Sequence, residues 1–180
     1  LTLKPGQQHS SALFASVDWG KTQAYALGLN GIFINRRDRE AHGIVEESDS
    51  AALKTQIREK LTELKDPKTE AAVVLQVYDG DSIYQGKAKA DAPDLVVGYA
   101  PGFRASWQTA LGGVPIELIE DNKEKWSGDH LIDPSQVPGV LFTNFKPTQP
   151  VQHIGEIGTL VSSLLELTSP PNQSDATDGQ

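Results

Sequence analysis

Cysteine and methionine are both absent from this sequence of 180 residues. Without cysteine, the chain has no thiolate metal ligand, no thiol nucleophile and no disulfide. Because position 1 is not Met, we expect these residues to be part of a longer protein. No apolar run approaches the about 20 residues that a membrane helix needs, and no signal-peptide pattern is found. The sequence predicts a soluble chain and does not identify its compartment or oligomeric state.

Positive charge is also scarce, with 16 Lys and Arg residues against 24 Asp and Glu residues. The net charge of -8 argues against a nucleic-acid duplex or an anionic membrane as the main partner. A small phosphoester remains a possible substrate, because bound divalent cations reverse the local field.

Short apolar runs predict the strands of one sheet. The runs at 71–78, 94–99 and 139–144 are rich in β-branched and aromatic residues, which is typical of strands. Residues 24–35 predict a hairpin with its turn at Asn30-Gly31, the commonest short hairpin signal. One bulged strand is the alternative for the same residues, since an isolated glycine often marks a bulge.

Helical periodicity is found in two places. One helix is predicted with Asp49 or Ser50 as the cap at its start and with its end after Lys65. Its apolar face is made by Leu53, Ile57, Leu61 and Leu64. A second helix is predicted from 154 to 167. Alternating helices and strands indicate an α/β or mixed sheet. We expect residues 1–168 to form part of one domain and residues 169–180 to be a disordered tail.

The adjacent residues Asp129 and His130 are the strongest chemical signal. They lie on a Gly-containing loop in WSGDHLIDPSQVPGVLF, shortly before an apolar run. Imidazole nitrogen and carboxylate oxygen are the ligands that zinc takes when sulfur is unavailable. The alternative is a loop Asp that accepts backbone hydrogen bonds beside a surface His.

Three long segments resemble, in the same order, those of type I phosphodiesterase/nucleotide pyrophosphatase-like proteins. They are VDWGKTQAYALGLNGIFINRRDREAHGIV (17–45), APDLVVGYAPGFRASWQTALGGVP (92–115) and DNKEKWSGDHLIDPSQVPGVLFTN (121–144). The last helix is similar too, with Gly158-Thr159 where the family has Pro-Thr.

The resemblance implies a metal-dependent phosphoester hydrolase of the alkaline phosphatase superfamily. Its fold would be α/β, with a mixed sheet flanked by helices, of which this chain is the C-terminal part. The cofactors would be two divalent metal ions, zinc in most members, and the nucleophile would be a Thr or Ser. His130 matches the family's late metal-ligating His, and Asp129 would orient it. The nucleophile and the other ligands have no match here, so this chain alone is expected to be inactive.

Two further sets of residues have alternative interpretations. Asp38 and His42 have a chelating spacing and could form a mononuclear site with His130, or could simply belong to a charged turn. Arg104 could bind a phosphate oxygen and Trp107 could stack on a base of a nucleotide-like substrate. Alternatively, Trp107 fills the core and Arg104 pairs with an acidic neighbour.

A second function fits the same residues. The chain could be a catalytically inactive accessory or binding module derived from the hydrolase fold. Because superfamily members act on several ester classes, the sequence does not separate monoester from diester substrates.

Overall fold

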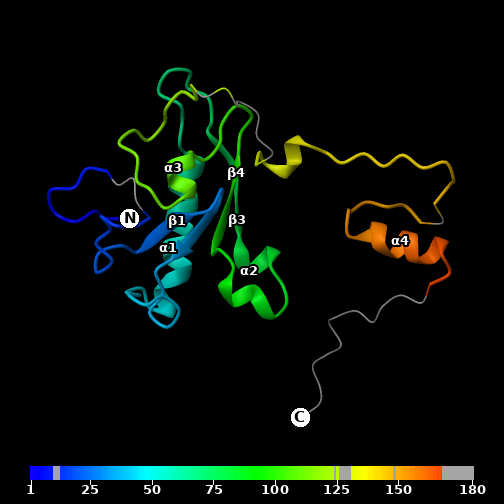
Figure 1. The fold of residues 1–180 in the computed structure, drawn as a ribbon, viewed down its shortest axis with the longest axis horizontal. Coiled ribbons are helices and arrows are strands. Elements are labelled where there is room, and N and C mark those ends of the chain that lie inside the picture. The colour runs from blue at the N-terminus through cyan, green and yellow to red at the C-terminus, as the bar shows by residue number, and fades with distance from the viewer. Residues whose placement is uncertain (10–12, 124, 126–130, 148, 168–180) are drawn as a thin grey trace, which may run out of the picture. The chain divides into compact units, whose positions relative to one another are not determined.

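A computed structural model describes residues 1–9, 13–123, 125, 131–147 and 149–167 of the chain. It divides into two compact units, Leu1–Val137 and Pro138–Gln180, which we call the first and second units. The sheet lies in the first unit, and the second unit contains a single helix among its described residues (Figure 1).

The first unit is built on a four-stranded sheet in the order β1-β2-β4-β3. Its strands are β1 (Ala24–Leu27), β2 (Gly31–Ile34), β3 (Val74–Asp79) and β4 (Leu95–Tyr99). The predicted mixture of helices and strands is confirmed. All three strand pairs of this sheet are antiparallel. The apolar run of β4 is central, whereas β3 lies at an edge.

The predicted hairpin is confirmed, but its loop begins two residues earlier than expected and has three residues rather than two. Leu27 pairs with Gly31, so the loop consists of the three residues 28–30. Gly28 has φ +75°, a conformation that favours glycine. Gly31 belongs to β2, where an added Cβ would lie 2.9 Å from Cγ of Pro93. Close packing, rather than a turn, explains that second glycine.

The first predicted helix is also confirmed, as α1 (Glu47–Thr62), which packs against β3. Its predicted cap is wrong, since Glu46 precedes the helix without a side-chain cap bond and Ser50 is buried within it. The helix ends before Leu64, whose carbonyl oxygen accepts a hydrogen bond from Val73 N at 3.1 Å. Pairing with the chain that enters β3 therefore ends the helix earlier than its periodicity predicts.

The main core lies between α1 and the sheet. Its buried members are all β-branched or Leu side chains from β3, β4 and the residue before β3: Val73, Val74, Val77, Leu95 and Val97. Ile57, Leu61 and Leu64 pack against this cluster, as the helical period predicted. Short helical segments connect the larger elements: α2 (Gly80–Ile83), η1 (Lys87–Asp91), α3 (Trp107–Ala110) and η2 (Pro134–Gln136).

The predicted strand at 139–144 is wrong. These residues form no ladder with any described strand, and Val140 and Phe142 are 84% and 91% exposed. A β-branched run becomes a strand only where a neighbouring strand takes its backbone hydrogen bonds, and no described strand does so.

The helix of the second unit is α4 (Glu156–Leu164), inside the predicted range. Glu156 Oε2 accepts hydrogen bonds from the backbone N–H of Gln152 and His153 at its start. The expected disordered tail lies outside the described residues. None of the helices in the described part of the chain is both long and apolar enough to cross a membrane.

Candidate functional site

A large cavity of about 970 Å³ lies in the first unit, and we call it the large cavity. Segments far apart in sequence line it: the β1–β2 hairpin, the chain from β4 through α3, and the loop from Pro115 to Lys123. Most of the lining residues come from the segments 17–45 and 92–115, and the segment 121–144 contributes its first three residues, 121–123. Folding therefore brings parts of all three to one place.

The floor of the large cavity is apolar and continuous with the core. Val73, Val74 and Val97 are core residues that also line the cavity, and Phe103 and Ile119 pack against the same cluster. An apolar hollow of this size with a few polar side chains is typical of a small-molecule site.

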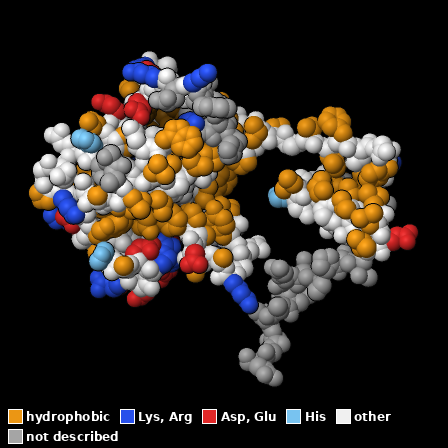
Figure 2. Space-filling model, in the orientation of Figure 1, with side chains coloured by type: hydrophobic (Ala, Val, Ile, Leu, Met, Phe, Trp, Pro, Cys, Tyr) orange, Lys and Arg blue, Asp and Glu red, His pale blue; other side chains and the backbone are white. Residues whose placement is uncertain are grey.

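Arg104 and Trp107, both predicted substrate contacts, lie together on the wall of the large cavity. The Arg104 guanidinium carbon is 4.6 Å from the centroid of the indole ring, a cation–π contact. Arg104 Nε also donates to the carbonyl oxygen of Ala105 at 3.2 Å. Trp107 is 58% exposed, so the alternative in which it fills the core is wrong. Figure 2 shows many hydrophobic side chains on the surface of the first unit.

Local hydrogen bonds fix α3, which carries Trp107. Ser106 caps the helix, its Oγ accepting from the backbone N–H of Thr109 at 3.1 Å. Gly28 N donates to the carbonyl oxygen of Ala110 at 3.1 Å, which joins α3 to the hairpin turn. The hairpin turn therefore helps to hold the short helix that carries the indole.

Two of the charged side chains at the large cavity form an ion pair. Lys68 Nζ lies 2.6 Å from Asp121 Oδ2, and this hydrogen bond raises the pKa of Lys68. Burial raises the pKa of Tyr99, which also lines the cavity, so its hydroxyl stays protonated at neutral pH.

The predicted metal residues Asp129 and His130 lie outside the described residues. Elsewhere in the described chain, no group of three or more His, Asp or Glu side chains is placed to hold a metal ion. Asp38 and His42 are exposed on the turn that follows β2, as the charged-turn interpretation predicted.

Sequence reasoning missed Asp133, which is 1% exposed. Its Oδ2 accepts from Tyr78 Oη at 2.9 Å, and its Oδ1 accepts from the backbone N–H and the Oγ of Ser135 at 2.9 and 2.6 Å. Burial acts to raise the pKa of Asp133, but these hydrogen bonds outweigh it and hold the pKa below its ordinary value. No salt bridge to Asp133 is found among the described residues.

Asp133 attaches the start of η2 to the sheet. Its backbone N–H donates to the carbonyl oxygen of Tyr99 at 2.9 Å, beside a bridge between Tyr99 and Ile132. A Cβ on Gly98 would overlap the Asp133 carboxylate, so glycine in β4 makes room for it. The sequence signal available was Asp-Pro-Ser, a common start of a helical turn.

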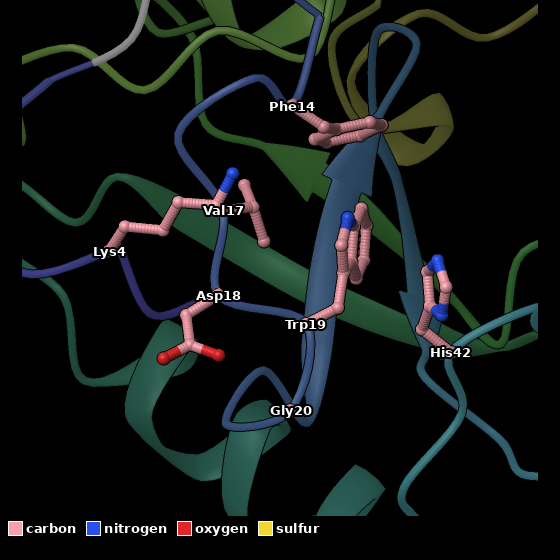
Figure 3. Close-up of a pocket in the computed structure, with 7 residues that line it drawn as sticks. All are labelled: Lys4, Phe14, Val17, Asp18, Trp19, Gly20 and His42. Carbon is pink, nitrogen blue, oxygen red and sulfur yellow. The ribbon is translucent and has the colours of Figure 1, made fainter.

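A second cavity of about 360 Å³ shares no lining residue with the large one, and we call it the small cavity. Its lining side chains include two aromatic rings, a lysine, an aspartate and a histidine (Figure 3). The family resemblance gave no role to these side chains.

Comparisons with known proteins give no relative for this chain. No family model, no curated protein and no solved structure matches it. Any function must therefore be argued from the residues and from their arrangement.

Proposed function

We propose that this chain is the C-terminal part of a metal-dependent phosphoester hydrolase of the type I phosphodiesterase/nucleotide pyrophosphatase kind. The observation that carries the proposal is the convergence of the three family-like segments on the large cavity. Segments that serve one function are expected to meet at one site when the chain folds. The complete fold would be alkaline-phosphatase-like, with the present sheet as one portion of it.

The large cavity would hold the alcohol portion of a small, nucleotide-like phosphoester. Trp107 presents a 58% exposed ring for stacking, and the floor offers apolar contact. Arg104, stacked on that ring, would donate N–H groups to a phosphate oxygen.

When bound, two divalent metal ions, zinc in this proposal, would stabilise the charge on the attacking and leaving oxygens. His130 would ligate one of them through an imidazole nitrogen, and Asp129 would orient that ring. The described residues supply no complete ligand set, so the other ligands and the Thr or Ser nucleophile would come from sequence outside this chain.

The test compares this chain with a longer protein that includes the upstream sequence of its gene. We expect about two zinc ions and turnover of bis-p-nitrophenyl phosphate only in the longer protein. In that protein His130→Ala should reduce both zinc content and turnover. His153→Ala is the matched control, because His153 is exposed beside α4, and it should leave both unchanged.

Two outcomes would overturn the proposal. Turnover with bound metal in the short chain would place the active site elsewhere. Full zinc content and full rate in the His130→Ala protein would remove its assignment as a ligand. If the longer protein binds phosphoesters at the large cavity but neither binds zinc nor turns them over, the chain belongs to an inactive binding module.

A further inference from the structure

The small cavity is bordered by a rigid group of aromatic rings. Trp19 lies with its ring centroid 5.3 Å from that of Phe14 and 5.2 Å from that of Tyr25, both edge to face. Tyr25 in turn stacks on Phe33 at 5.4 Å. Rings packed in this way hold the indole of Trp19 in one orientation.

The backbone on the Phe14 side of the small cavity is strained. Phe14 has φ +50°, which is uncommon for any residue other than glycine, and its N–H donates to the carbonyl oxygen of Gly112 at 3.0 Å. Such strain persists only where the surrounding structure imposes it, and it often marks ligand sites.

One buried amide fixes the two sides of the small cavity relative to each other. Asn35 is fully buried, and its Nδ2 donates to the carbonyl oxygens of Trp19, Thr22 and His42 at 3.3, 2.8 and 3.1 Å. The turn that carries His42 packs so closely that a Cβ on Gly43 would overlap the backbone of Arg36. The loop of Trp19 and the turn of His42 are therefore held in place before any ligand binds.

The small cavity is lined by one cation, Lys4, and one anion, Asp18, and the anion has a second lysine beside it. Lys4 Nζ donates to the carbonyl oxygen of Ala15 at 3.0 Å, which uses one of the three N–H groups of the ammonium. The carboxylate of Asp18 lies 3.6 Å from Lys21 Nζ, so these two charges offset each other. Figure 3 shows the Asp18 carboxylate directed away from the rings of Phe14 and Trp19.

We propose that the small cavity binds a small aromatic anion, a single planar ring that carries a carboxylate or phosphate group. The ring would pack against Trp19, and Lys4 would donate to the anionic group. The volume of about 360 Å³ is near the lower end of ligand pockets and suits one ring. This site is separate from the large cavity and does not depend on the proposed hydrolase activity.

The experiment titrates the ¹⁵N-labelled chain with three probes and follows its ¹H–¹⁵N spectrum. The probes are benzoate, cyclohexanecarboxylate, which is not planar, and benzylamine, which is cationic. We expect benzoate to shift the indole N–H of Trp19 and the backbone amide of His42 saturably. Cyclohexanecarboxylate should bind about fivefold or more weakly, the lower end of what ring stacking contributes. Benzylamine keeps the ring but should also bind more weakly than benzoate, because Lys4 repels its ammonium group. Trp19→Phe assigns the indole signal.

Surface variants test the site without disturbing the fold. Lys4 is exposed, and Lys4→Met keeps most of the stem while removing the charge, so benzoate should bind about two- to fivefold more weakly. Lys68→Met, at the large cavity, should leave the dissociation constant unchanged. Benzoate shifts that do not saturate, equal affinity for benzylamine, or unchanged benzoate affinity in Lys4→Met would each overturn the proposal.

Discussion

The hydrogen bond from Tyr78 to the buried carboxylate of Asp133 should contribute measurably to the stability of the fold, and Tyr78→Phe removes it. Tyr78 Oη is the one described donor to Asp133 Oδ2, at 2.9 Å, and Asp133 is 1% exposed. Tyr78→Phe would leave that oxygen buried with neither the hydroxyl nor free access to water. A hydrogen bond to a charged group contributes about 1.5–3 kcal/mol, so the free energy of unfolding should fall by about that amount.

Urea unfolding, followed by circular dichroism and tryptophan fluorescence, would give this difference directly. For a chain of this size, each kcal/mol lowers the melting temperature by about 2–4 °C, so a decrease of roughly 3–12 °C is expected. Tyr84→Phe is the matched control, because no side-chain hydrogen bond from Tyr84 is found among the described residues. Its effect should stay within about 0.5 kcal/mol.

A double-mutant cycle separates this hydrogen bond from other effects of the lost hydroxyl. In a protein that already carries Asp133→Ala, Tyr78→Phe should lower the free energy of unfolding only slightly. The coupling energy between the two positions should be about 1–3 kcal/mol. A coupling energy near zero, or a Tyr78→Phe protein as stable as its parent, would refute the reasoning.

Three further predictions concern stability and are checked by urea unfolding. Gly98→Ala should lower the free energy of unfolding by about 2–4 kcal/mol, because the new Cβ displaces the Asp133 carboxylate. Gly139→Ala is the control, because open space surrounds Gly139, and it should change the free energy of unfolding little. Lys54→Met should cost roughly 1–2 kcal/mol, because the buried ammonium lies 3.0 Å from Asp79 Oδ1; a cost below about 0.3 kcal/mol would contradict this. Burial acts to raise the pKa values of Asp79 and Asp133, but their hydrogen bonds hold both below the ordinary value. Stability should therefore be full above about pH 5 and fall as the pH drops below about 4, and a flat profile down to pH 3 would contradict this.

The proposals for the two cavities need different experiments. The proposal for the large cavity concerns a hydrolase that extends beyond these residues, so its test needs a longer protein and added zinc. The side chains invoked at the small cavity all belong to this chain, so its test needs only the chain itself. Failure of one test leaves the other proposal standing.

Local features of the sequence determined much of the secondary structure. The hairpin follows from glycines between two short runs of apolar and aromatic residues, and α1 follows from apolar residues at helical spacing. These signals depend on residues within four positions of one another, so they can be seen without knowing the fold. The turn of the hairpin was misplaced because Gly31 is needed for packing against Pro93, a contact that local sequence does not reveal.

Only the tertiary structure decided which distant residues meet. The exposure of Trp107, the burial of Asp133 under Gly98 and the three carbonyls held by Asn35 all depend on contacts between distant segments. The apolar run at 139–144 also shows that local sequence alone does not determine a strand. Its composition favours a strand, but a strand also needs a neighbour for its backbone hydrogen bonds, and only the fold determines whether that neighbour is present.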